Sequence, residues 1–285
     1  MNYLMLLRKM SLYLYKKRGL RRVSNWLKKR YARHPREVIV TDFDGDLSFK
    51  CFLHLHIGSQ IFWHGCYSCP QLLLLDRILK PDMVFVDVGA NVGEQTVFAA
   101  KRLTGGQVIA FEPTTAMYQC LVANVNSNGF RNVKAMKLGL GERTDKLPIF
   151  VTDDILPDGT SNEGVPTLYP SHDRNKLLET VDIVRFDEFV PQLQLERLDI
   201  MKIDVEGAEL AVLRGAEDTI RRFMPLIIME VHEGTSLSSK HTPNALLECL
   251  EDYGYRTEGL VQNGNTRTFD PSELTTFRDV VGYPR

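Results

Sequence analysis

The chain has 285 residues and a mass of 32.5 kDa; 44% of its residues are hydrophobic and 25% are charged. This balance is typical of a globular protein and excludes long disorder, collagen-like sequence and small disulfide scaffolds. No stretch reaches the ~18 uninterrupted apolar residues of a membrane-spanning helix. The five cysteines are odd in number and unevenly spaced, which predicts free thiols in a cytoplasmic protein. They are Cys51, Cys66, Cys69, Cys120 and Cys249.

Charge is segregated along the chain, although the formal net charge is −1. Residues 1–36 carry 12 of the 35 Lys and Arg residues and none of the 36 Asp and Glu residues, so 23 basic and 36 acidic side chains, a net −13, remain. Leu, Met, Tyr and Trp stand among these cations at near-helical spacing, and Arg8 and Lys9 interrupt any export signal. We predict a basic amphipathic helical segment. Its role stays open between packing on the acidic body, peripheral contact with the inner membrane surface and nucleic-acid binding.

Residues 38–64 read as strands, with a tight turn at Asp44-Gly45-Asp46. The range 71–79 has helical spacing and stops before Pro81. We therefore divide the chain into the basic segment 1–36, an N-terminal hairpin and helix over 37–80, and a main domain over 81–285.

Strands and helices alternate from Met83 onward. Strands are predicted at 84–88, 108–111, 133–138, 200–203 and 226–231, and helices at 94–102, 115–126, 208–222 and 245–252, with a polar loop at 153–176 and closing strands over 255–285. This order is typical of an α/β fold, a doubly wound, mostly parallel sheet covered on both faces. Ligands of such sheets bind at the carboxyl ends of the strands.

The first of these strands ends in Asp87-Val88-Gly89-Ala90-Asn91-Val92-Gly93. Gly89 and Gly93 would let the backbone pass close to a ligand, but the dinucleotide fingerprint would need a glycine at Asn91. Glu112, after the next strand, is placed to accept both hydroxyls of a ribose. An acid, a glycine turn and a second acid indicate S-adenosylmethionine rather than NAD, and Asp87 suits an ammonium group.

Further ionisable side chains follow the last two parallel strands. Asp204 and Glu206 end one strand, and Glu230, His232 and Glu233 end the next, so we expect them in one crevice. Asp204 and His232 are the candidate catalytic bases, with Glu206 and Glu233 as orienting groups. Asp204, Glu206 and Glu230 could offer oxygen ligands to Mg²⁺, but the spacing does not require a metal and none is predicted.

A second group of possible ligands stands before the main domain. His54, His56, His64, Cys66 and Cys69 could bind zinc, yet a second C-x-x-C is absent. We therefore predict free thiols near the mouth of the pocket.

The stretches VFVDVGANVGEQT, FEP, DIMKIDVEGAELAVLRGA and IIMEVHE resemble the FkbM-type family of S-adenosylmethionine-dependent methyltransferases over about residues 60–235. The resemblance implies a class I methyltransferase sheet of seven strands, the last antiparallel. It also implies that Asp87, Gly89, Ala90, Asn91 and Gly93 line the methionine portion of the cofactor and that Glu112 holds its ribose. Many members carry a Glu after a Gly-x-Tyr pattern, whereas here Gly65-Cys66-Tyr67 is followed by Ser68.

By that resemblance the chain methylates a hydroxyl of a sugar, glycolipid or polyketide-like product, so its partner would be a small-molecule, glycan or lipid-linked acceptor. An RNA methyltransferase is one alternative, but the acidic body disfavours nucleic acid. A non-catalytic cofactor-binding protein that docks on membranes through its basic helix is another. A dehydrogenase is disfavoured by the glycine spacing.

Overall fold

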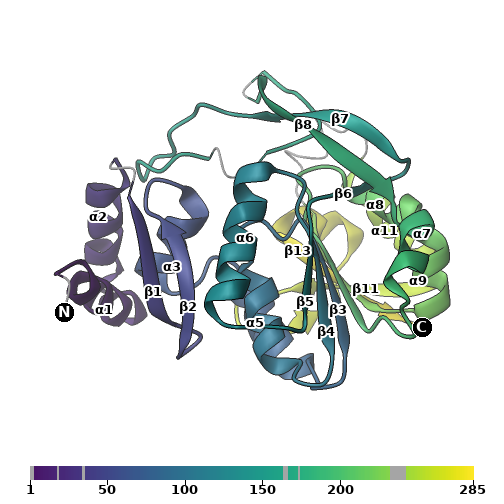
Figure 1. Cartoon of the computed structure of the whole chain (residues 1–285), viewed down its shortest axis with the longest axis horizontal. Coiled ribbons are helices and arrows are strands. Elements are labelled where there is room, and N and C mark those ends of the chain that lie inside the picture. The colour runs from purple at the N-terminus through teal and green to yellow at the C-terminus, as the bar shows by residue number, and fades with distance from the viewer. Residues whose placement is uncertain (1–2, 18, 34–35, 163–165, 173, 232–241) are drawn as a thin grey trace.

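The computed structural model describes the chain except residues 1–2, 18, 34–35, 163–165, 173 and 232–241 (Figure 1). Its centre is an eight-stranded sheet in the order β12-β11-β13-β10-β9-β3-β4-β5. The bounds are β3 Val84–Val88, β4 Gln107–Phe111, β5 Val133–Met136, β9 Ile200–Ile203, β10 Leu226–Glu230, β11 Tyr255–Leu260, β12 Thr266–Arg267 and β13 Asp279–Pro284. Strands β5, β4, β3, β9 and β10 are parallel, and β13 runs antiparallel between β10 and β11.

This strand order confirms the predicted class I methyltransferase sheet, including its antiparallel last strand. The short β12 at the edge is one strand more than the seven that the resemblance implies. The order of connection reverses between β3 and β9, because the chain first adds β4 and β5 on one side and then crosses back. Ligands of such sheets bind beyond the carboxyl ends of the strands at this switch point.

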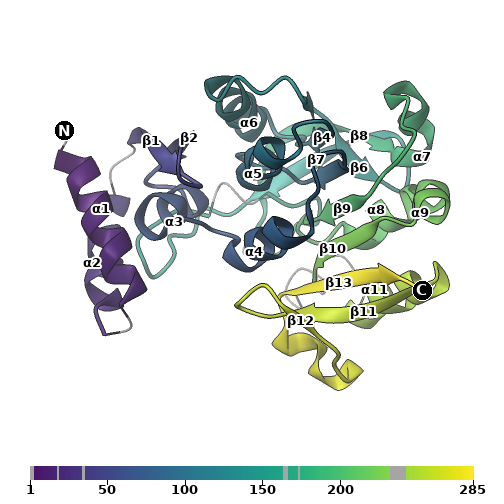
Figure 2. The same cartoon turned by 90° about the horizontal axis from the view of Figure 1, so that it is seen from below.

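Alternate residues of the strands supply two cores, as the two-residue period of a strand requires. Phe85 belongs to the core shared with the first-half helices, and its neighbours Val84 and Val86 belong to the opposite core. The first face is covered by α4 Cys69–Ile78, α5 Glu94–Arg102 and α6 Thr115–Ser127, and the second by α7 Phe186–Phe189, α8 Glu209–Gly215, α9 Glu217–Phe223 and α11 Pro243–Asp252 (Figure 2). The predicted helix 208–222 is thus two helices that meet at Ala216.

The N-terminal part lies beside the first face. It contains α1 Tyr3–Lys16, α2 Arg21–Ala32, β1 Glu37–Phe43, β2 Leu47–Phe52 and α3 His56–His64. The turn between β1 and β2 is confirmed, but the prediction of strand up to residue 64 is wrong. Ile57, Ile61 and Phe62 are buried at helical spacing, and a Cβ at Gly58 would lie 2.6 Å from the backbone nitrogen of Phe52. Tertiary packing therefore selects a helix over the strand propensity of this stretch.

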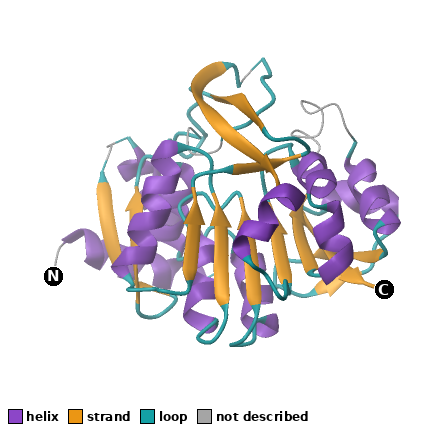
Figure 3. Cartoon of the chain, turned by 45° about the vertical axis from the view of Figure 1, so that its right-hand side comes forward, coloured by secondary structure: helices purple, strands orange, loops and turns teal. Residues whose placement is uncertain are grey.

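A second, three-stranded sheet lies across the carboxyl ends of the parallel strands (Figure 3). It consists of β6 Gly139–Gly141, β7 Asp145–Val151 and β8 Lys176–Arg185 in the order β6-β8-β7. The sequence predicted the long loop between β7 and β8 but not the strands. No helix in the described part of the chain is both long and apolar enough to cross a membrane.

Candidate active site

A cavity of about 990 Å³, counting space open to solvent, lies at the switch point beneath the small sheet. Its walls include seven residues that the sequence predicted for the cofactor or for catalysis and that now lie together: Asp87, Gly89, Ala90, Asn91, Glu112, Asp204 and Glu206. Gly93 is not part of its wall, because it caps α5 and packs on Leu121. His232 and Glu233 lie outside the described residues.

The turn after β3 is shaped by its own backbone contacts. The amides of Gly89 and Ala90 both donate to the carbonyl of Phe111, at 3.0 and 2.9 Å. Gly89 has a φ of 76°, and a Cβ there would lie 1.9 Å from the carbonyl oxygen of Asp204. The glycine at position 89 is thus required by close packing between the ends of β3 and β9.

Glu112 is held rigidly at the end of β4. Its carboxylate accepts hydrogen bonds from the amide of Asn91 at 2.9 Å and from the amide and hydroxyl of Thr114 at 2.9 and 2.6 Å. Burial raises the pKa of Glu112, and these donors oppose that rise. A carboxylate fixed in this way can only accept further hydrogen bonds, as a pair of ribose hydroxyls would require.

Asp87 is fully buried and shares its charge with a lysine that the sequence reasoning left out of the site. Its Oδ2 accepts a 2.6 Å hydrogen bond from Thr96, and its Oδ1 lies 3.3 Å from Nζ of Lys202. Lys202 also donates to the carbonyl of Gly89 at 2.7 Å. Burial opposes a charged ammonium, but the carboxylates of Asp87 and Asp204 outweigh it and raise the pKa of Lys202. The sequence feature that could have identified Lys202 was its place at the start of the stretch KIDVEGAE.

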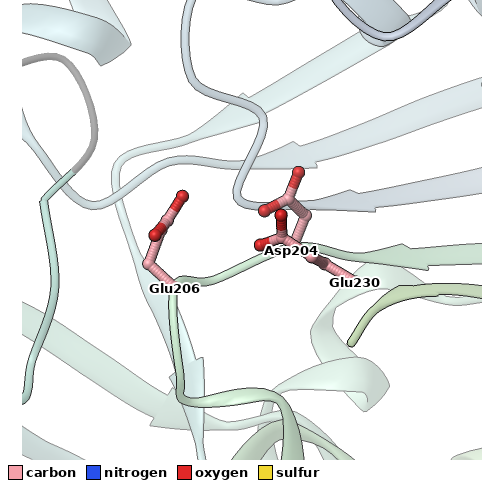
Figure 4. Close-up of side chains that lie close together, drawn as sticks. All are labelled: Asp204, Glu206 and Glu230. Carbon is pink, nitrogen blue, oxygen red and sulfur yellow. The ribbon is translucent and has the colours of Figure 1, made fainter. Parts of the chain in front are cut away.

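Three carboxylates from two strand ends converge on the other side of the cavity (Figure 4). Asp204, Glu206 and Glu230 each offer an oxygen within 4.8 Å of the others. Arg174 pairs with Glu206 and Arg278 with Glu230, each at 2.9 Å.

Burial, and next the charge of Asp204, raise the pKa of Glu206 to about 7. The pKa of Glu230 is also raised, by burial and by its acidic neighbours. Glu206 and Glu230 therefore take up a proton more readily than exposed carboxyl groups do, a property that catalytic carboxyl groups share.

Glu94, at the start of α5, is a further carboxylate of the cavity that the sequence reasoning missed. It accepts hydrogen bonds from the amides of Tyr67 and Ser68, at 2.6 and 2.9 Å, and from the Ser68 hydroxyl at 2.5 Å. The hydroxyl of Tyr67 accepts a 2.7 Å bond from Arg278. Tyr67 and Ser68 of the Gly-x-Tyr-Ser segment thus form part of the cavity wall, and the serine binds a carboxylate instead of supplying one.

The cysteines next to this wall correct a prediction. Cys66 and Cys69 form a disulfide, so the expectation of free thiols at these two positions is wrong. The spacing of three residues at the start of α4 brings the two sulfur atoms together.

The candidate zinc-binding histidines serve other contacts. Nδ1 of His56 lies 3.2 Å from the Thr160 hydroxyl, and His64 stacks on Tyr15. Cys51, Cys120 and Cys249 are free.

The fold and the site define a class of protein. A class I sheet, a glycine turn after β3 and a hydroxyl-accepting carboxylate after β4 are the features of a methyltransferase that uses a nucleoside cofactor. The apolar side chains of Leu140, Ile149 and Ile183 line the cavity and suit an adenine ring. The residues present thus fit S-adenosylmethionine.

The family follows from the model that matches the chain. Residues 87–257, more than half of the chain, match the methyltransferase FkbM domain, and the chain belongs to this family. It is thus a methyltransferase that depends on S-adenosylmethionine.

Three curated relatives illustrate the range of the family. The AMB antimetabolite synthetase AmbE of Pseudomonas aeruginosa is 29% identical over 70% of this chain, which spans only 10% of AmbE. The methyltransferase sdnD of Sordaria araneosa is 27% identical over 70% of this chain and 81% of its own. The 31-O-demethyl-FK506 methyltransferase FkbM of Streptomyces tacrolimicus is 27% identical over 63% of this chain and 77% of its own.

Proposed function

We propose that the chain methylates a hydroxyl oxygen of a sugar, glycolipid or polyketide-like acceptor. The observation that carries this proposal is that Asp204 and Glu206 line the same cavity as Asp87 and Glu112. A hydroxyl must lose a proton as its oxygen takes up a methyl group, and a carboxylate beside the cofactor can accept it. The relative from Streptomyces tacrolimicus, whose name specifies an oxygen, supports a hydroxyl acceptor.

In this proposal Asp87, Gly89, Ala90 and Asn91 border the methionine portion of the cofactor, and Gly93 starts the helix that follows them. Lys202 pairs with the Asp87 carboxylate and holds it in place, so that Asp87 can face the cofactor's ammonium group. Glu112 binds the two ribose hydroxyls. When bound, the cofactor supplies an activated methyl group, so the residues on the other side mainly orient the acceptor oxygen and remove its proton.

Asp204 is the proposed base, with Glu206 as the group that tunes it; His232, which lies outside the described residues, stays a second candidate base. The side chain of Asp204 is 22% exposed and that of Glu206 17%, so both can meet a substrate while remaining largely desolvated. Arg174 holds Glu206 by one oxygen. The acidic neighbours make the cluster more basic than an exposed carboxylate and suit it to proton transfer near neutral pH.

Methyl transfer from S-adenosylmethionine carrying a ¹³C-labelled methyl group tests this function. The protein would be incubated with panels of glycosides, uronic acids and macrolide alcohols, and products read by mass spectrometry and ¹³C NMR. We expect a labelled methyl ether. A label found only on nitrogen, carbon or RNA would overturn the proposal, and the same assay with Asp204→Asn identifies background methylation.

A further inference from the structure

The inner side of the α1–α2 hairpin is fixed firmly to the body. Leu4, Leu7 and Leu27 belong to the core, and the hydroxyls of Ser11 and Ser24 meet at 2.6 Å. The two buried cations are both neutralised by acids of the body: Arg8 pairs with Asp42 at 2.8 Å and Lys28 with Asp158 at 2.5 Å. The hairpin is therefore a rigid part of the molecule, at the end farthest from the C-terminus (Figure 1).

The outer side of the hairpin exposes an apolar row. Tyr3, Leu6, Met10 and Tyr13 follow one another at helical spacing on α1, with exposed fractions of 67%, 51%, 42% and 62%. Val23 and Trp26 on α2, and Leu20 before it, are also exposed apolar side chains of the hairpin, and Trp26 is 63% exposed. Seven of the twelve large hydrophobic side chains exposed in the described chain thus lie within these 24 residues. Such a concentration indicates a binding surface.

The exposed surface of residues 1–36 is also strongly cationic. Its exposed basic residues have no acidic neighbour in residues 1–36, and in the described structure none of them takes part in an ion pair with an acid of the body. They are Lys9, Lys16, Lys17, Arg21, Arg22, Lys29, Arg30, Arg33 and Arg36. We call the exposed apolar row and these cations together the hairpin surface.

We propose that the hairpin surface binds the surface of an anionic lipid bilayer. Aromatic and aliphatic side chains enter the headgroup region of a membrane while Lys and Arg bind its anionic lipids, so this ligand uses both halves of the surface. A nucleic-acid backbone would engage the cations but leave the apolar row without contacts. A second copy of the hairpin would bring like charges together. The proposal is independent of the acceptor and of the methyl transfer.

The two tryptophans of the chain provide a direct measurement. Trp26 is exposed, whereas Trp63 is fully buried, so only Trp26 can change its environment when the hairpin meets a vesicle. We expect the emission of the full chain to shift to the blue with vesicles of phosphatidylcholine and phosphatidylglycerol, and not with phosphatidylcholine alone. Brominated lipids should quench the shifted emission. Trp26→Phe, which retains Trp63, should show neither change.

Charge and apolar variants separate the two halves of the surface. Lys16→Glu, Lys17→Glu, Arg21→Glu and Arg22→Glu combined should abolish co-sedimentation with the anionic vesicles, since each charge near the membrane changes affinity about fivefold. Leu6→Ser with Tyr13→Ser should weaken binding at least tenfold. The matched control, Arg131→Glu with Lys134→Glu on the body, should bind as the unaltered chain does.

Binding of S-adenosylhomocysteine, measured by calorimetry, shows that each variant is folded and keeps the cofactor site separate from this test. Three outcomes would overturn the proposal. These are no binding to the anionic vesicles, binding that Leu6→Ser with Tyr13→Ser leaves unchanged, and preferential binding of an RNA duplex at the same ionic strength.

Discussion

Glu112 at the end of β4 and Glu206 after β9 line one cavity, yet their surroundings differ. Glu112 receives three hydrogen bonds from uncharged donors and faces no carboxylate of the acidic cluster. Glu206 is bonded to Arg174 but faces Asp204 and Glu230, and its pKa rises to about 7. Uncharged donors fix a carboxylate for binding, whereas crowded like charges prepare one for proton transfer. The cavity thus has a binding side and a proton-transfer side.

The largest expected effect is on the proton-transfer side. Asp204→Asn should lower turnover by ~10²–10⁴-fold, because an amide cannot accept the hydroxyl proton. Binding of S-adenosylhomocysteine, measured by calorimetry, should stay within a few-fold. Asp252→Asn, an exposed carboxylate on α11, is the matched control and should leave both unchanged. Full turnover of Asp204→Asn with normal cofactor binding would show that another group, such as His232, is the base.

Lys202 lies between the binding side and the proton-transfer side, because it is close to both Asp87 and Asp204. Its loss should lower the free energy of unfolding. Lys202→Met leaves Asp87 buried without its cation, which should destabilise the fold by about 3–5 kcal/mol. Thermal unfolding followed by circular dichroism measures this effect. Lys146→Met, an exposed lysine paired with Asp182, should leave the midpoint nearly unchanged. If the two variants unfold alike, the Asp87–Lys202 pair does not contribute as its burial implies.

On the binding side, Glu112→Gln should lower the affinity for the cofactor by ~10–100-fold, because hydrogen bonds to a charged group contribute about 1.5–3 kcal/mol. Turnover at saturating cofactor should change little. Titration calorimetry and the Michaelis constant for S-adenosylmethionine report the two quantities, with exposed Glu248→Gln as control. A variant that lost turnover but kept affinity would reverse the assignment of the two sides.

The pH dependence of kcat/KM should reflect the raised pKa of Glu206 on the proton-transfer side. Glu206 tunes Asp204 through its negative charge, which protonation removes, so kcat/KM should fall as the pH falls through about 7 and level off above it. Glu206→Gln removes the group whose pKa lies near 7, so this limb should disappear. A limb that stays in place in Glu206→Gln would mean that a group outside the cluster titrates.

The smallest effect on turnover is expected from the removal of metal ions by a chelator. Arg174 and Arg278 already neutralise part of the acidic cluster, so EDTA should leave turnover unchanged. Activity that is lost in EDTA and restored by Mg²⁺ would instead assign the three carboxylates to a metal.

The sequence predicted the parts of the fold that depend on local pattern. The strand 84–88, the helix 94–102 and the strand 200–203 have the predicted bounds, because a buried β-branched run, a glycine turn and an amphipathic helix each leave a short-range signal. The convergence of Asp87, Glu112, Asp204 and Glu206 followed from one topological rule, since all four stand at or just beyond strand ends.

What the sequence did not predict depends on contacts between distant segments. The strand propensity of residues 56–64 gives way to a helix because Gly58 packs against the backbone of Phe52. The sequence did not predict β7 and β8, because each mixes polar with apolar residues and has few buried positions. The role of Glu94 depends on Ser68, 26 residues earlier. Contacts between residues this far apart in the sequence leave no local sequence pattern.

The small sheet β6-β8-β7 supplies Leu140, Ile149 and Ile183 to the cavity, and the loop it carries adds Pro166 and Leu168. No strand of this sheet pairs with the central sheet. Its length, its loop and its inward side chains can therefore vary without breaking a hydrogen-bond ladder of the core. An exchange of the loop between β7 and β8, with Leu140, Ile149 and Ile183 kept for the adenine ring and the catalytic edge left untouched, is a route by which a new acceptor preference could be engineered in this enzyme.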